Sequence, residues 1–218
     1  MVNKTGSRYE KESEIGISHF LEHLCLGFAK NPSYDKLVSG ATFYEHTHYR
    51  IRVETAEEIP VGLATLEQIL SGKIINPEQV NEIREDVVSE WNGNYQSESY
   101  YIRKAVFDEL FHKDLVSRFP IGRYENIINL DLNELLAYHK KFYATNSSAI
   151  MCFGNFELLD VEKQIISTFG NLKESRSHTF KSYIGELACE SKYTIKFSPV
   201  SLKQIKGEIY CLLVINYK

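Results

Sequence analysis

The feature that most restricts the fold of this chain is the segment His19-Phe20-Leu21-Glu22-His23, which reads H-x-x-E-H. On a helix that advances about 100° per residue, His19, Glu22 and His23 share one face. Two imidazoles one turn apart can bind a single Zn²⁺, and a carboxylate beside them can accept a proton from a metal-bound water. The alternative is a buried amphipathic helix whose histidines are only hydrogen-bonded. The motif favours the zinc site.

Composition and charge exclude several classes of function. The chain has 218 residues, enough to bury a core, and its net charge of −4 with no basic cluster argues against nucleic acid as a partner. No apolar run is long enough to span a membrane, and the N-terminus lacks the apolar core of a signal peptide. The cysteines are far apart, without C-x-x-C spacing, so we expect buried thiols in a reducing, cytoplasmic compartment: Cys25, Cys152, Cys189 and Cys211.

Hydrophobic periodicity and turn residues predict helices mixed with short strands. One strand is expected over 41–54, where aromatic or β-branched residues alternate with polar ones, and another over 148–153. The expected helices span 16–29, 33–39, 57–71, 77–98, 99–111, 132–143 and 157–169, with a turn at Ser39-Gly40. The polar stretch 173–191 is typical of a linker. Strands at 192–198 and 207–217 would then start a further, incomplete domain.

Other histidines and acids offer weaker candidates for a metal site. On a strand, His46 and His48 share a face while Glu45 points away, which indicates a solvated or substrate-facing surface rather than a second metal site. His139 is interpreted as a packed or surface histidine. The helix over 77–98 carries a run of acids that is typical of a solvated face. A catalytic zinc nevertheless needs three protein ligands, and the H-x-x-E-H histidines supply two.

The surroundings of the motif resemble those of the pitrilysin/insulinase-type zinc peptidases, the inverzincins. The resemblance is carried by Gly6-Ser7-Arg8-Tyr9-Glu10, by Gly16 and by His19-Phe20-Leu21-Glu22-His23. It continues in the same order through Val87-Val88-Ser89-Glu90, Pro120-Ile121-Gly122, Tyr138 to Tyr143 and Gly154-Asn155-Phe156. It therefore covers about residues 4–172. The mitochondrial processing peptidases share this pattern.

This resemblance implies a fold, an activity and a ligand set. The implied fold is α+β, an antiparallel sheet with helices packed on one face, in a domain over residues 1–172. The implied activity is a zinc-dependent endopeptidase for oligopeptides, with Zn²⁺ held by His19, His23 and Glu90, and with Glu22 as the general base. Glu90 matches the family's third ligand because it closes Val87-Val88-Ser89-Glu90, and Glu85 is the alternative if the register slips. The strand over 41–54 lacks the Asn-Ala pair that lines the family's substrate cleft.

The resemblance also implies that the chain does not work alone. Family members enclose a peptide substrate between two homologous halves, so we expect a complementary pitrilysin-like half or a homodimer, and neither nucleic acid nor membrane. A longer section precedes the Gly6–Glu10 segment in the family. We therefore expect truncation at both ends and a missing strand beside residues 1–8. The alternatives are a non-catalytic or truncated subunit that binds zinc or a partner peptidase half, and a zinc-binding domain without hydrolysis.

Overall fold

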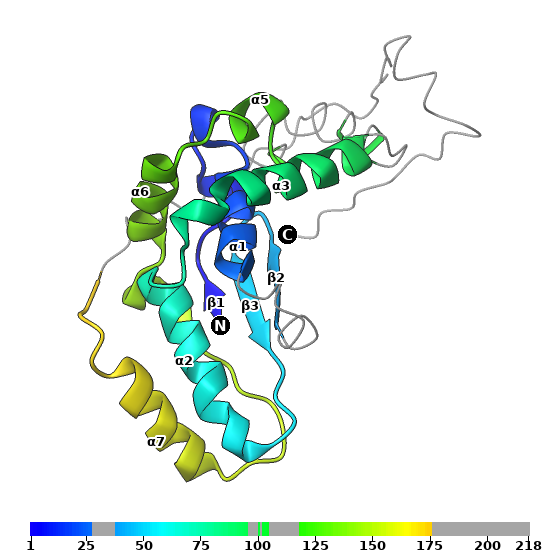
Figure 1. Ribbon diagram of the computed structural model, residues 1–218. Coiled ribbons are helices and arrows are strands. Elements are labelled where there is room, and N and C mark those ends of the chain that lie inside the picture. The colour runs from blue at the N-terminus through cyan, green and yellow to red at the C-terminus, as the bar shows by residue number, and fades with distance from the viewer. Residues whose placement is uncertain (28–37, 96–99, 101, 105–117, 176–218) are drawn as a thin grey trace, which may run out of the picture.

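The structure is a computed structural model that describes residues 1–27, 38–95, 100, 102–104 and 118–175 (Figure 1). Within these ranges an antiparallel sheet has the strand order β2-β3-β1-β4, with helices packed on one face. The predicted α+β fold class is confirmed. The strands are β1 Val2–Asn3, β2 Val38–Thr42, β3 Thr47–Ile51 and β4 Ser148–Ala149.

The helices agree with most of the predicted spans. They are α1 Ile17–Leu26, α2 Ile59–Ser71, α3 Val80–Tyr95, α5 Tyr124–Ile127, α6 Leu132–Phe142 and α7 Leu158–Phe169. Single 3₁₀ turns occupy Ser7–Tyr9, Glu12–Glu14, Ala56–Glu58, Pro77–Gln79 and Thr145–Ser147. None of the helices in the described ranges combines the length and apolar character needed to cross a membrane.

Local sequence explains where these helices begin and end. Asp131 caps α6 because its side chain accepts a hydrogen bond from the Glu134 N–H at 2.8 Å. The Glu134 side chain in turn accepts a hydrogen bond from the Asp131 N–H. Asn76 accepts from the Glu78 N–H in the turn that leads into α3. Helix α2 ends at Gly72, whose φ of 77° lies in the left-handed region.

The predicted single strand over 41–54 is wrong, because the segment belongs to a hairpin. Strand β2 already begins at Val38, so the predicted turn at Ser39-Gly40 is wrong as well. The chain reverses over residues 43–46, where the Phe43 N–H donates to the His46 carbonyl at 2.8 Å. An alternating pattern is the same on both arms of a hairpin, so it could not reveal the reversal. Two further helices were predicted over 33–39 and 99–111, and most of the residues of each lie outside the described ranges.

Residues 2–3 do not lack a neighbouring strand, contrary to the sequence-based expectation. Strand β1 lies between β3 and β4: Val2 pairs with His48 on one side and with Ala149 on the other. Strand β1 therefore lies inside the sheet, and β2 and β4 are the outermost strands among the described residues. The predicted linker after residue 175 and the strands at 192–198 and 207–217 lie outside the described residues.

Helix α1 is the centre of the core. It packs against β2 and β3 on one side and against α3 and α6 on the other. Eight of its residues are buried, and Ile17, Phe20, Leu21, Leu24 and Cys25 are fully so. The H-x-x-E-H segment is thus held on a helix that is in contact with its neighbours on nearly every side.

Two glycines meet back to back where the chain enters α1. Gly16 has a φ of 108° and Gly122 a φ of 83°, which side chains rarely tolerate. A Cβ added at Gly122 would lie 2.5 Å from the Gly16 Cα, and one added at Gly16 would lie 2.9 Å from the Gly122 Cα. The close approach needs glycine at both positions.

We predict that Gly122→Ala lowers the free energy of unfolding by roughly 2 kcal/mol or more, because backbone must move to admit the methyl group. Gly93→Ala in α3 is the matched control: apart from the backbone of the helix itself, no atom of the described residues lies within 4 Å of the added Cβ. That variant should be stabilised by about 0.5–1 kcal/mol. Urea denaturation measures both. Equal stability of the two variants would contradict the prediction.

Candidate metal centre

A buried carboxylate fixes the start of the helix that carries the motif. The Glu10 side chain accepts hydrogen bonds from the Gly16 N–H at 2.8 Å and from the Ser18 N–H at 2.9 Å. It thereby pairs two N–H groups at the N-terminus of α1, where the helix dipole also favours negative charge. The Ser18 hydroxyl in turn lies 2.8 Å from the Tyr138 hydroxyl of α6. These contacts set the rotation of α1.

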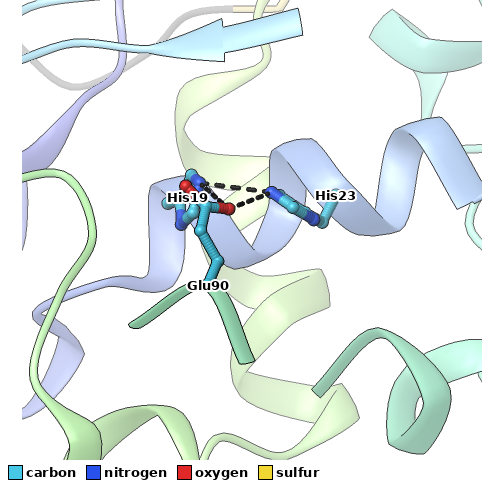
Figure 2. Close-up of side chains that lie close together, drawn as sticks. All are labelled: His19, His23 and Glu90. Carbon is cyan, nitrogen blue, oxygen red and sulfur yellow. Dashed lines mark hydrogen bonds and ion pairs between the residues drawn. The ribbon is translucent and has the colours of Figure 1, made fainter. Parts of the chain in front are cut away.

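Three side chains from α1 and α3 meet beside this helix start (Figure 2). The His19 Nε2 and His23 Nε2 atoms are 3.2 Å apart, and they lie 3.5 and 3.3 Å from the Glu90 Oε2 atom. His19 is buried, His23 is partly buried and Glu90 is exposed on the cleft side. Glu85, the alternative third ligand, lies on an exposed part of α3 and is not in the cluster.

The spacing of the three atoms fits a tetrahedral zinc site. Zinc bonds to nitrogen and oxygen are about 2.0–2.1 Å long, which puts the ligand atoms of a tetrahedron roughly 3.3–3.4 Å apart. The three separations lie close to this value. Two imidazoles and a carboxylate are also ligand types found in catalytic zinc sites. The residues therefore fit Zn²⁺ in both type and geometry.

Burial and mutual interaction shift the titration of all three groups. Burial, reinforced by the nearby His23, lowers the pKa of His19, so this imidazole is neutral near pH 7. Burial also acts to lower the pKa of His23, but the hydrogen bond to Glu90 and the charge of Glu22 raise it overall. The same hydrogen bond lowers the pKa of Glu90. A neutral imidazole and an ionised carboxylate are the forms that bind a metal.

The described part of the chain offers no acceptor for the second ring nitrogen of His19. The His19 Nδ1 atom is buried and has no hydrogen-bond partner there. Metal-bound histidines usually donate this N–H to a carbonyl or carboxylate. The ring of His19 is held instead by packing, with the His23 ring edge-on to it at 4.6 Å.

Glu22 lies beside the three candidate ligand atoms but is not part of the cluster. It is buried, and its carboxylate accepts a hydrogen bond from the Thr42 hydroxyl of β2 at 2.9 Å. Burial raises the pKa of Glu22, partly offset by the Thr42 hydrogen bond. A carboxylate with a raised pKa is a better proton acceptor near neutrality. Thr42 was not predicted to contact the site, because the hairpin that brings it there was not recognised.

A cleft of about 480 Å³ opens in front of these residues. Edge strand β2 forms one wall through Gly40, Ala41 and Thr42. A Cβ at Gly40 would lie 2.8 Å from a Glu22 carboxylate oxygen, so glycine makes room for that side chain. The other lining residues are Phe43, Tyr44, Asn94, Arg103, Phe119, Pro120 and Ile121. Sequence reasoning missed Asn94 and Arg103, since nothing in the pattern distinguishes them from surface residues.

The other candidate positions do not form a metal site. His46 and His48 stack at 6.1 Å, with Phe43 against them, and Glu45 pairs with Arg8 instead. His139 is buried and lies 2.8 Å from the Ile69 carbonyl through its Nε2 atom. Among the described residues, only His19, His23 and Glu90 form a cluster that could hold a metal.

Comparison with known proteins agrees with this geometry. The family model described as insulinase (peptidase family M16) matches residues 1–123, more than half of the chain. The chain belongs to the insulinase family of peptidases. The resemblance seen in the sequence is therefore confirmed, and the H-x-x-E-H segment lies inside the matched region.

Other members of the insulinase family are similar along most of this chain. The mitochondrial-processing peptidase subunit beta of Dictyostelium discoideum is 25% identical over 187 residues, which cover 79% of this chain and 39% of that protein. An uncharacterised zinc protease of Rickettsia bellii is 21% identical over 85% of this chain and 48% of its own length. The chain thus spans less than half of the length of these two relatives.

A solved protease structure agrees with this chain in fold. The periplasmic protease PqqL from Escherichia coli superposes with a TM-score of 0.76 at 17% identity, over 85% of this chain and 22% of that one. At this identity the likeness concerns the fold alone. The arrangement of sheet and helices described above is therefore one that solved proteases of similar fold adopt.

We predict that Glu10 makes the stability of this insulinase-family domain fall as pH rises from about 4.5 to 7. Burial raises the Glu10 pKa to about 7. The folded state therefore binds a proton that the unfolded state has already lost in this window. A shift of this size is on the order of 3 kcal/mol. Glu10→Gln cannot titrate and should flatten the slope.

The measurement is urea denaturation at a series of pH values between 4.5 and 7.5. Glu125→Gln, at an exposed position on α5, is the control and should keep the slope of the parent protein. A slope that is unchanged in Glu10→Gln would mean that other groups cause the pH dependence.

Proposed function

We propose that this chain is the zinc-binding half of an endopeptidase that hydrolyses internal bonds of oligopeptides. The observation that carries the proposal is the meeting of His19 Nε2, His23 Nε2 and Glu90 Oε2 at zinc-ligand spacing, with Glu22 beside them but outside the set. Membership of a peptidase family and similarity to a zinc protease support the same reaction.

In this proposal His19, His23 and Glu90 hold Zn²⁺, and each of the other residues has a separate task. Bound zinc would lower the pKa of a coordinated water and polarise the scissile carbonyl. Glu22 accepts the proton of the attacking water and then gives it to the leaving amine. Thr42 holds the Glu22 carboxylate in place through its hydroxyl. Burial keeps Glu22 away from bulk water and so raises its proton affinity.

The substrate proposed is an extended peptide that lies along β2. Among the described strands this one is the outermost on its side of the sheet, and it lines the cleft. Unpaired backbone groups on an edge strand can form ladder hydrogen bonds with an extended peptide, which gives affinity without demanding a particular sequence. Phe43 and Tyr44, next along the chain, line the same cleft and offer aromatic surface to substrate side chains.

A partner half completes the proposed enzyme. The chain spans 39% of a relative that is named as a subunit of a processing peptidase. We propose a complementary pitrilysin-like half, or a second copy of this chain, that closes over the cleft. A cytoplasmic location stays a prediction. It was inferred from the expectation of buried cysteines, which is confirmed for Cys25 but wrong for Cys152, which is exposed.

We predict about one Zn²⁺ per chain, and its loss in His19→Ala and His23→Ala, since two ligands do not hold zinc tightly. Glu90→Gln should weaken binding by at least about ten-fold, because an amide is a poorer ligand than a carboxylate. Glu85→Gln is the matched control on the same helix and should retain zinc. Elemental analysis of the purified variants decides between them. Full zinc content in Glu90→Gln would move the third ligand elsewhere.

We predict that Glu22→Gln keeps zinc and loses peptide hydrolysis by about 100-fold or more, because the amide preserves shape but cannot accept a proton. Cleavage of a long unstructured peptide is followed for the chain alone and with a complementary pitrilysin-like half added. Equal cleavage by parent and variant would refute the role of Glu22. Zinc binding without cleavage in either mixture would favour a non-catalytic zinc-binding subunit.

A further inference from the structure

The cleft in front of the candidate metal centre contains a cation that the proposed chemistry does not use. Arg103 lines this cleft together with Tyr44 and Phe119. Of the described residues around the cleft, Arg103 is the only one with a permanent positive charge. Its side chain is exposed, so a bound peptide can reach the guanidinium group.

Aromatic contacts hold Arg103 at this position. Its Cζ atom lies 5.0 Å from the centre of the Phe119 ring, and Phe119 is itself buried. The Phe119 ring packs in turn on Tyr100 and Tyr44, at centroid distances of 5.7 and 6.4 Å. Burial raises the pKa of Tyr44 to about 12, and the charge of the nearby Arg103 acts in the opposite direction. A guanidinium group attracted to an aromatic ring still has N–H donors for a further partner.

No carboxylate in the described part of the chain forms an ion pair with Arg103. Glu45, at the turn of the β2-β3 hairpin, pairs with Arg8 instead. The carboxylates that line the cleft are Glu22 and Glu90, and a bound Zn²⁺ would balance their two charges. The charge of Arg103 is then left without a counterpart. A carboxylate on the substrate is the partner that best matches a guanidinium group in charge and shape.

The direction of β2 indicates which part of a peptide lies beside Arg103. All described strand pairs in the sheet are antiparallel, and a peptide that continues this pattern runs antiparallel to β2. The proposed base is held by Thr42, and Tyr44 follows two residues later along the chain. Peptide residues that precede the cleaved bond therefore lie beside Tyr44 and Arg103. Two residues of extended chain span roughly 7 Å, which points to the second residue before the bond.

We propose that Arg103 selects peptides that carry a glutamate or aspartate on the amino-terminal side of the cleaved bond, centred on the second residue before it. This inference rests on the proposed endopeptidase function and names the class of its substrates. The peptide carboxylate pairs with the guanidinium group, beside the rings of Phe119 and Tyr44. Because Arg103 is exposed, the preference is moderate and is screened by salt.

The first test compares peptides that differ in a single residue. An otherwise neutral, unstructured peptide carries one glutamate, glutamine or lysine, and this residue is moved along the sequence. Cleavage is followed with the chain alone and with a complementary pitrilysin-like half added. The glutamate peptide should have a kcat/KM at least about five-fold above that of the lysine peptide, with cleavage on the carboxyl side of the glutamate.

Variants separate Arg103 from the overall charge of the chain. Arg103→Glu should reverse the preference, so that the lysine peptide is cleaved faster than the glutamate peptide. Arg103→Met should remove the difference between the two peptides. Lys104→Glu is the matched control: it makes the same change in charge one residue along, at an exposed position that is not among the described residues of the cleft, and should keep the parent preference.

A binding measurement tests the same preference without catalysis. Glu22→Gln, which cannot use the proposed base, is titrated into fluorescently labelled glutamate and lysine peptides, and anisotropy reports their affinities. The glutamate peptide should bind several-fold more tightly, and a salt concentration of about 1 M should reduce the difference, because the Debye length then falls to about 3 Å. A glutamate preference in binding without cleavage by the parent chain would support Arg103 while contradicting the proposed function.

Four results would overturn this inference. They are equal cleavage and equal binding of the glutamate and lysine peptides, a preference that requires glutamate after the cleaved bond, a loss of preference in Lys104→Glu as large as that in Arg103→Glu, and the absence of any peptide binding. Cleavage without a charge preference would contradict the role of Arg103 alone and leave the proposed function in place.

Discussion

The hydrogen bonds of the buried Glu10 carboxylate are the constraint on which the site depends. Two N–H groups at the start of α1 have no partner within the helix, and burying them unpaired would cost on the order of 1–3 kcal/mol each. Glu10 accepts from both and so fixes the position and rotation of α1. The cost is a buried carboxylate, visible in its raised pKa. The Arg118 guanidinium, which donates to the Glu10 carbonyl, lowers that cost in part.

The same region shows why the turn at 120–122 belongs to the site. The close approach of Gly122 to Gly16 lets this turn lie against the start of α1. Pro120 and Ile121 then line the cleft in front of His19 and His23. The backbone contact between the two glycines thus places the turn at 120–122 beside the candidate metal ligands, although the two segments are about a hundred residues apart in the sequence.

The strand beside the site connects the sheet to the proposed chemistry. Among the described strands β2 is the outermost on its side of the sheet, and its Thr42 hydroxyl holds the proposed catalytic base. In the proposed enzyme an extended peptide would pair with the backbone of this strand, so affinity would not demand a particular side-chain sequence.

Sequence alone determined the helices, the zinc motif and the family, because each rests on short-range patterns. The spacing of His19, Glu22 and His23 requires only the helical period, and the caps at Asp131 and Gly72 are local. The resemblance matched Glu90 to the third ligand, but the sequence pattern of the helix over 77–98 did not by itself distinguish Glu90 from Glu85. Only packing of α3 against α1 decided which of the two acids reaches the histidines.

Tertiary structure also decided what no local pattern contains. The alternation over 41–54 is the same for one strand and for a hairpin, so the reversal that brings Thr42 to Glu22 was invisible. The position of β1 between β3 and β4 depends on pairing with residues far away in the sequence. Side-chain period identifies the face of a strand but not its neighbours, because hydrogen bonds between strands carry no sequence code.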